Sequence, residues 1–329
     1  MQLSKLYWRR ASIGLIVTLV CSIAGQFLAK LPGFSLIGHL VLALLLGMCL
    51  QFARSLTAAA QQSTPFIANK FLRAGIILLG FKLNLVILMS AGLKSLEAAV
   101  VIVAVMIPLN YFVARFFKVE HTLALLTACG CSICGAAAVM GVSGAVRAKT
   151  DQSVLAVAIV AILGTLFTLI EVGLQPFLGF TDAQFGVMAG LSLHEIAPAG
   201  PVGTDSAIIA KLSRVLLLAP VAIIVGILEA RRFRKQDGAG EGRMSVPIPW
   251  FMGGFILASA IGSYLPFVND FVPSLVQLAY LLLGMAMAAL GLNVNFSVIL
   301  QKGLRPMVGA LLCSFVIMGL AFSIVHTFF

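Results

Sequence analysis

The stretch ACGCSICGAAAVMG, from Ala128 to Gly141, places three cysteines and three glycines within fourteen residues between strongly apolar flanks. Small residues at this density predict either a close contact between helices or a break in a helix, because glycine lowers the cost of leaving the helical conformation. A broken helix is tolerated inside a membrane only where protein or a water-filled cavity surrounds it. The meaning of the stretch therefore depends on whether the chain is a membrane protein.

The composition answers that question. Of the 329 residues, 61% are hydrophobic and 10% are charged, and the mean hydropathy is +1.10, which excludes a soluble globular domain. About eleven apolar runs are long enough, or nearly so, to cross a hydrocarbon core that needs about 20 residues. Lipid cannot satisfy backbone polar groups, and the runs lack the alternation of barrel strands. We therefore predict an all-α polytopic membrane protein, with spans near residues 11–29, 34–53, 71–90, 96–116, 122–146, 153–176, 185–209, 213–229, 248–266, 272–292 and 306–328.

The basic residues indicate how the chain is oriented. The net charge is +11, and the lysines and arginines that cause it lie in short loops. This placement is typical of the positive-inside pattern and not of nucleic-acid binding. We expect the N terminus in the cytoplasm, and the first run to be a retained helix instead of a cleaved signal peptide. Two pairs of basic residues are exceptions, because the span count places them on the side of the membrane opposite to the cytoplasm. They are Arg147 with Lys149 and Lys211 with Arg214. Lys211 and Arg214 either attract an anion or snorkel at a helix end.

A single polar, glycine-rich stretch, RRFRKQDGAGEGR, reads as a linker. It divides the chain into a membrane bundle over residues 1–230, a charged cytoplasmic linker over 231–247 and further membrane helices over 248–329. The first and last parts share an internal repeat. The stretch LGLNVNFSVILQKGLR at 290–305 aligns without gaps to LGFKLNLVILMSAGLK at 79–94. An odd number of spans separates the copies, so they predict an inverted repeat, as in many secondary transporters.

A second, weaker match links GCSICGAA, residues 130–137, to GLSLHEIA, residues 190–197. It pairs Ser132 with Ser192, and a lysine and an apolar span follow each copy. Our span count makes these copies parallel, which conflicts with a simple inverted pair.

The cysteines of the opening stretch leave three readings besides a broken helix. A metal site needs about four ligands; the three cysteines could be joined by His194, but the chain has no second CxxC. Cys131 and Cys134 resemble a redox pair, and close helix packing also explains small residues.

We favour the broken helix. Gly130 and Gly135 would allow the chain to unwind, and freed N–H groups with Ser132 would then face a bound anion. In the matching segment, Pro198 and Pro201 make a continuous helix improbable.

His194 and Glu195 then lie near membrane depth, where an ionisable residue is a functional hypothesis by default. His194 would contact substrate or couple protons, and Glu195 would couple protons; the alternative for both is structural packing.

Other polar residues in apolar runs have less specific roles. Asn84 and Asn295, which are equivalent in the repeat, would contact substrate, cap broken backbone or bond between helices, as would Lys82 and Asn293. Glu171 is expected to be a structural partner for a cation.

Three elements together, SICGAAAVMG, GLSLHE and AKLSRVLLLAPVAI, resemble the YeiH-like sulfate exporter family, which is similar to the superfamily of bile-acid symporters and cation/proton antiporters. The resemblance covers the chain from about residue 12 to its end, apart from the linker. It implies crossing broken helices in a bacterial inner-membrane carrier of a small sulfur oxyanion such as sulfate or sulfite.

We therefore expect a secondary active exporter that works by alternating access, and not an enzyme. It would use a proton gradient or, as second choice, sodium. We expect no cofactor, no metal and no nucleic acid, only the anion, the coupling ion and the bilayer as partners, and leave a homo-oligomer open. A cation/proton antiporter and an intramembrane thiol oxidoreductase are the alternatives. The expected substrate residues are Gly130, Ser132, Gly135, Ser192, His194, Asn84 and Asn295; His194 and Glu195 would couple ions, and Lys211 and Arg214 would attract the anion.

Overall fold

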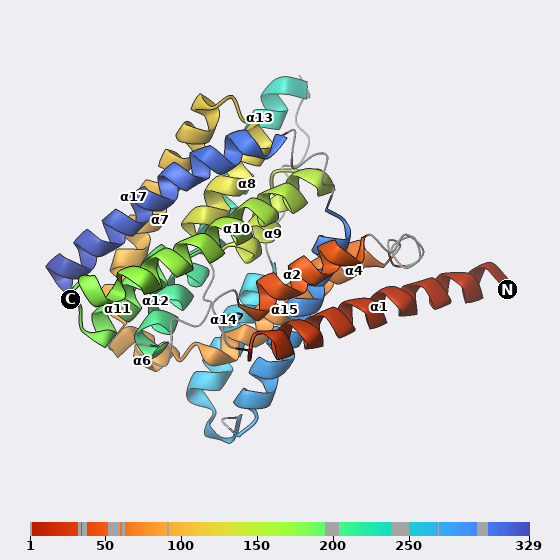
Figure 1. The fold of residues 1–329 in the computed structure, drawn as a ribbon, viewed down its shortest axis with the longest axis horizontal. Helices are drawn as coiled ribbons and strands as arrows, with labels where there is room; N and C mark the ends of the chain where they lie inside the picture. The colour runs from red at the N-terminus through yellow and green to blue at the C-terminus, as the bar shows by residue number, and fades with distance from the viewer. Residues whose placement is uncertain are drawn as a thin grey trace. The chain divides into compact units, whose positions relative to one another are not determined.

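The computed structural model describes residues 2–31, 34, 38–51, 60, 63–90, 92–194, 204–237, 250–268, 270–294 and 302–329. Within these ranges every regular element is a helix, as predicted (Figure 1). Six helices are long and apolar enough to cross a membrane, and three shorter apolar helices accompany them. The chain is therefore an all-helical polytopic membrane protein, while the number of about eleven spans stays a prediction.

The helices form two compact units. The described part of Met1–Val86 and the segment Gly254–Phe296 form the first unit. The second unit is built from Ile87–Ile196, Gly200–Gly253 and Ser297–Phe329, as far as these segments are described. Each unit therefore combines segments that are far apart in the sequence.

In the first unit, α2 and α15 pack with their backbones in close approach. A Cβ atom on Gly47 would collide with the carbonyl oxygen of Ala288, and one on Gly291 would collide with that of Leu44. Only glycine permits such a contact between helices. The elements of this unit are α1 (Gln2–Leu28), α2 (His39–Leu50), α4 (Thr64–Phe66), a π-helical turn (Ile67–Phe71), α5 (Leu72–Leu79), a 3-10 turn (Gly80–Lys82), the start of α6 (Leu85–Ser90), most of α14 (Trp250–Tyr264), a second 3-10 turn (Pro266–Val268) and α15 (Val272–Leu292).

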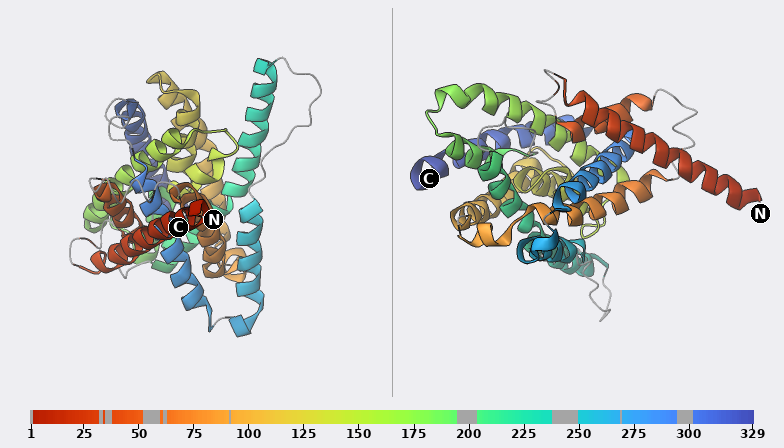
Figure 2. Two further views of the ribbon diagram at one scale, coloured as in Figure 1. Left: turned by 90° about the vertical axis from the view of Figure 1, so that its right-hand side faces the viewer. Right: turned by 90° about the horizontal axis from the view of Figure 1, so that it is seen from below.

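The second unit surrounds a largely buried helix, α10, whose most apolar window of 18 residues is 72% buried. Apolar side chains of α7, α11 and α17 form a shared core that includes Ile102, Leu191 and Ile317. Helix α13 lies at the edge of this unit (Figure 2). The elements are α7 (Leu93–Phe116), α8 (His121–Ser132), α9 (Ala136–Ser143), α10 (Thr150–Leu174) with a 3-10 turn (Gln175–Phe177), α11 (Asp182–Ser192), α12 (Thr204–Leu216), α13 (Leu218–Asp237) and α17 (Leu304–Phe328).

Two predicted span boundaries are wrong. The span expected over 71–90 begins at Thr64 and ends at Lys82, because Pro65 fits the first turn of a helix and Leu83 is extended. The span expected over 213–229 belongs to a helical segment over Ser206–Arg234. Pro220 lies in the first turn of α13, where a missing N–H removes no bond within that helix.

Candidate functional site

The first helix break lies where the sequence predicted it. Helix α8 ends at Ser132 and α9 begins at Ala136. Between them Gly135 has φ 79° and ψ −135°, a conformation that side chains other than hydrogen strongly disfavour. Its N–H donates to the carbonyl oxygen of Gly130 at 2.9 Å. The prediction of a broken helix is confirmed here, and Gly135 is the residue that permits the turn.

The second break lies in the matching segment. Helix α11 ends at Ser192, and Leu193 adopts an extended conformation with ψ 140°; the next described helix, α12, begins at Thr204. Residues 195–203, including Glu195 and both prolines, lie outside the described residues. Ser132 and Ser192, which the weak repeat pairs, are thus the last residues of α8 and α11. The repeat therefore corresponds to two equivalent helix ends.

A buried arginine joins these two ends. Arg214 on α12 is fully buried, and its Nη1 donates to the carbonyl oxygens of Leu193 at 3.0 Å and Gly190 at 3.3 Å. Its Nη2 donates to the carbonyl oxygen of Cys131 at 3.4 Å. The carbonyl groups at a helix C terminus carry partial negative charge and lack intrahelical partners. The guanidinium group therefore stabilises the ends of α8 and α11 at once.

Lys211, one turn earlier on α12, supports the same region. Its side chain is 5% exposed, and its Nζ donates to the carbonyl oxygens of Leu193 at 2.5 Å and His194 at 2.8 Å. Lys211 and Arg214 were exceptions to the charge pattern of the loops, and their burial explains why: both belong to the interior of the second unit. This placement argues against snorkelling of either side chain.

His194 is fully buried immediately after α11. Its Nε2 lies 2.8 Å from Oγ of Ser314 on α17, and the Ser314 hydroxyl donates to the carbonyl oxygen of Ala310. Nε2 is therefore the protonated nitrogen in this network, and Nδ1 is left as an acceptor. Nδ1 is buried and has no hydrogen-bond partner among the described residues. The ring is thus fixed on one side and open to a donor on the other.

Ser132 is also fully buried, and its Oγ accepts a hydrogen bond of 3.1 Å from Nδ2 of Asn110 on α7. Asn110 donates in addition to the carbonyl oxygen of Met106. The Ser132 oxygen is thus the acceptor of this pair, and a serine hydroxyl that accepts can also donate its proton. Asn110 was not among the predicted site residues, although an amide within the apolar run 96–116 was a signal for it.

Glu171 on α10 completes the polar centre. It is 1% exposed, and neither carboxylate oxygen has a hydrogen-bond partner in the described part of the chain. Ser192 lies beside it, but the Ser192 hydroxyl donates to the carbonyl oxygen of Met188 at 2.7 Å. Lys211 and Arg214 are within electrostatic reach of the carboxylate. Glu171 is therefore a buried acceptor near two cations.

Gly130 belongs to the packing of this region. A Cβ atom on Gly130 would come within 2.7 Å of Val139 and 2.9 Å of Val160. Its role in the structure is to let α8 pack against α9 and α10.

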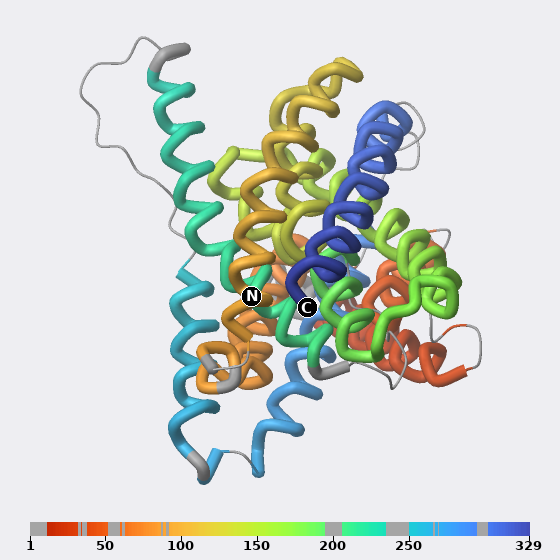
Figure 3. Tube along the Cα trace, turned by 90° about the vertical axis from the view of Figure 1, so that its left-hand side faces the viewer, coloured from red at the N-terminus to blue at the C-terminus, as the bar shows by residue number. Residues whose placement is uncertain are grey.

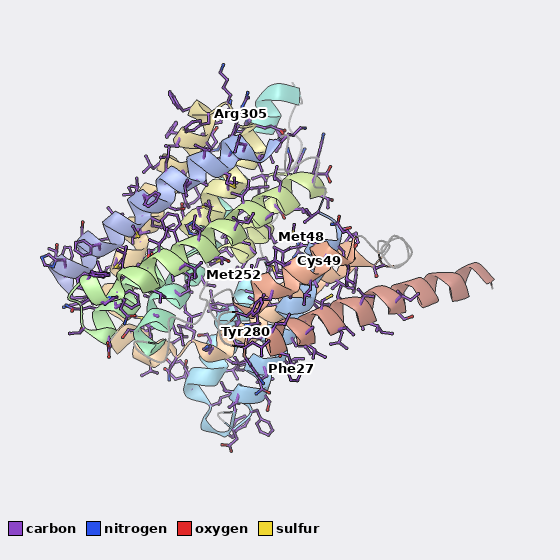
Figure 4. The ribbon with its side chains drawn as sticks, viewed as in Figure 1. Phe27, Met48, Cys49, Met252, Tyr280 and Arg305 are labelled. Carbon is purple, nitrogen blue, oxygen red and sulfur yellow. The ribbon has the colours of Figure 1, made fainter. Side chains whose placement is uncertain are left out.

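The predicted residues of the first repeat lie in the first unit. Asn84 is exposed and accepts from the backbone N–H of Val86 at the start of α6. Asn293 accepts a hydrogen bond from Thr64, and Lys82 donates to the hydroxyl of Tyr280 at 3.0 Å; Figure 4 labels Tyr280 on α15. The Asn84 contact is a helix cap, and the contacts of Asn293 and Lys82 join different helical elements. Both kinds of contact were predicted as alternatives to substrate binding. Asn295 lies outside the described residues.

The cysteines show free thiols. Cys129, Cys131 and Cys134 are buried, and Cys129 and Cys131 form no disulfide. No group of three histidine, cysteine or acidic side chains suited to a metal ion occurs among the residues that the structure describes.

Comparison with known proteins places the chain among bacterial membrane proteins. Residues 13–310 match the family model described as conserved hypothetical protein 698. The UPF0324 membrane protein of Lactobacillus johnsonii is 52% identical, with 88% of each chain covered. Its counterpart in Bifidobacterium longum is 45% identical over 98% of each chain, and that of Bacillus anthracis is 42% identical over 96% of this chain and 94% of its own. No solved structure matches the chain.

Proposed function

Since this chain belongs to the conserved hypothetical protein 698 family of membrane proteins, we propose that it is a secondary active transporter of a small anion. The substrate class is a sulfur oxyanion such as sulfate or sulfite, exported by alternating access. The protein would lie in the bacterial inner membrane with its N terminus in the cytoplasm. The observation that carries the proposal is the fully buried Arg214 at the ends of two broken helices.

Broken helices that end at a buried polar centre are a recurrent arrangement in secondary transporters. Charged groups inside a membrane protein are costly and usually mark a substrate or ion pathway. Here two cations and one carboxylate lie together in the second unit, among the described side chains.

The centre suits an oxyanion. Guanidinium groups recognise oxyanions through several N–H donors in a fixed plane, and the Nε of Arg214 has no hydrogen-bond partner among the described residues. The Ser132 hydroxyl can donate a further hydrogen bond. An anion at this centre would therefore gain charge and hydrogen bonds without displacing the cations from the helix ends.

The arrangement of α7 and α17 is consistent with an inverted repeat. Gly92 and Gly303, which the sequence repeat pairs, directly precede α7 and α17. The two helices pack together and run in opposite directions, as Figure 3 shows for the orange-to-gold α7 and the dark blue α17.

Two alternatives make different predictions. A cation/proton antiporter usually needs paired carboxylates, whereas Glu171 faces two cations, which disfavours a metal cation there. A thiol oxidoreductase requires Cys131 and Cys134, so their double substitution by serine would abolish its activity but leave transport intact apart from packing effects.

The test is flux in proteoliposomes that contain the purified protein. Labelled sulfite and labelled sulfate are supplied separately under imposed pH or sodium gradients. We expect saturable flux of at least one anion, and a loss of more than about tenfold in Arg214→Gln. Arg305, an exposed residue at the start of α17, provides the matched control Arg305→Gln.

Absence of saturable flux of either anion in folded wild-type protein would overturn the proposal. So would full flux by the Arg214→Gln variant. Arg214→Lys keeps the charge and separates loss of function from loss of folding, because it should retain part of the flux.

A further inference from the structure

Glu171 is a buried acceptor that the transport scheme above does not use. Its helix, α10, is mostly enclosed, and its side chain is 1% exposed with both oxygens unbonded among the described residues. Buried polar groups are almost always hydrogen-bonded, and an exception requires an explanation. Something outside the described side chains must satisfy this carboxylate for part of the time.

The groups around Glu171 restrict which ligand or ion can satisfy its carboxylate. The Ser192 hydroxyl beside it donates to the Met188 carbonyl oxygen. On α12, Lys211 and Arg214 are within electrostatic reach, and both donate hydrogen bonds to backbone carbonyl oxygens, which belong to Gly190, Leu193, His194 and Cys131. The remaining titratable groups of the region are His194 and the thiols Cys131 and Cys134 near Arg214. Ser192 interacts with the carboxylate, but neither carboxylate oxygen has a hydrogen bond of normal geometry within the described part of the chain.

A sodium ion is a poor occupant of this place. Hard cations require several oxygen ligands, and the carboxylate already faces two positive charges. A proton has neither difficulty: it forms a covalent O–H bond with a carboxylate oxygen and needs only one acceptor in return. Protonation also removes the negative charge that an incoming anion would meet.

We propose that Glu171 is the group that takes up the coupling proton, and that its protonation is linked to anion binding at Lys211 and Arg214. The proposal deepens the proposed function and rests on it. A proton from one side of the membrane binds to a Glu171 oxygen, and the two cations then act on the anion without competition. On the other side the O–H bond breaks, the ionised carboxylate competes for the cations, and the anion and proton leave together.

This inference replaces His194 and Glu195 as the first choice for proton coupling. Nε2 of His194 is already bonded to Ser314. His194→Gln, measured in the same assay, compares the two candidates directly.

The experiment separates exchange from coupled transport. Proteoliposomes carry unlabelled sulfite and a pH-sensitive dye, and labelled sulfite is added outside. In Glu171→Gln, which removes the ionisable group, we expect labelled sulfite to exchange for unlabelled sulfite at no less than half the wild-type rate. We expect its flux driven by a pH gradient, and the pH change driven by a sulfite gradient, to fall at least tenfold.

The control is Glu97→Gln, which alters an exposed carboxylate on α7 and should behave as the wild type. If Glu171→Gln retains wild-type coupling, the inference is overturned and transport stands. If wild-type exchange is saturable but independent of pH gradients, the inference is likewise overturned. If the wild type transports neither sulfite nor sulfate, the proposed function itself fails.

A measurement on the wild type covers the case in which Glu171→Gln does not fold. Infrared difference spectroscopy should show that added sulfite increases the carbonyl stretch of a protonated carboxylic acid. Glu171→Asp, which keeps a carboxyl group, should shift that band. No sulfite-dependent band in the wild type, or an unshifted band in the variant, would overturn the inference.

Discussion

Nζ of Lys211 donates to the backbone carbonyl oxygen of His194 at 2.8 Å. The same nitrogen donates to the carbonyl oxygen of Leu193, so one cation holds both residues that follow α11. This bond fixes the backbone that carries the His194 ring. Lys211 therefore helps to position both the end of α11 and the His194 ring, together with Arg214 and Ser314.

Lys211→Met should destabilise the protein because the His194 carbonyl oxygen loses its donor, while the Leu193 carbonyl oxygen keeps only the hydrogen bond from Arg214. Leaving buried acceptors without partners costs about 1–3 kcal/mol each. We expect a lower thermal midpoint in detergent, and faster hydrogen exchange around Leu193. Lys94→Met, at an exposed position of α7, is the control; equal midpoints for the two variants would contradict this role of Lys211.

Gly135→Ala should be destabilising by about 1–2 kcal/mol, since an alanine must adopt the positive φ of 79°. The matched control is Gly319→Ala within α17, where an added Cβ meets nothing within 4 Å. That change should be neutral or stabilising by up to about 1 kcal/mol. Thermal unfolding of both variants checks the difference, and a stable Gly135→Ala protein would mean that the break does not need glycine.

The sequence predicted the helix breaks because local chemistry causes them. Gly135 permits a backbone conformation that other residues disfavour, and this is visible in the residue type alone. The weak match that pairs Ser132 with Ser192 corresponds in the structure to the ends of α8 and α11. Arg214 was singled out because its charge did not fit the loop pattern.

The partners of these residues were not predictable from the sequence. The bonds of Arg214 to carbonyl groups of α8 and α11 arise from tertiary packing, which brings residues more than 80 positions apart together. Asn110 donates to Ser132 for the same reason. Span boundaries such as 213–229 failed because hydropathy does not separate a membrane span from its helical extension.

A bridge between three helices gives a prediction about α13. The hydroxyl of Tyr111 on α7 lies 2.8 Å from Nδ1 of His121, and Nε2 of His121 lies 2.7 Å from Oε1 of Glu229 on α13. Helix α13 packs against few other described elements, so this bridge should be a main attachment of its far end. In His121→Ala we expect hydrogen exchange around residues 226–234 to accelerate at least severalfold.

The control for that measurement is Tyr111→Phe, which removes one hydrogen bond but leaves the contact with Glu229. It should have a smaller effect on α13 than His121→Ala. Unchanged exchange in His121→Ala would show that other contacts hold the helix.

The two paired serines should differ in function although they occupy equivalent helix ends. Ser132 accepts from Asn110 and keeps its hydroxyl proton, whereas Ser192 donates its proton to its own helix at Met188. A hydrogen bond to a charged group contributes about 1.5–3 kcal/mol, so Ser132→Ala should weaken anion affinity about 10–100-fold. Ser192→Ala should change it less than about threefold, because its proton is not available to the anion. The concentration dependence of sulfite exchange measures both, and equal losses in the two variants would place the anion elsewhere than beside Ser132.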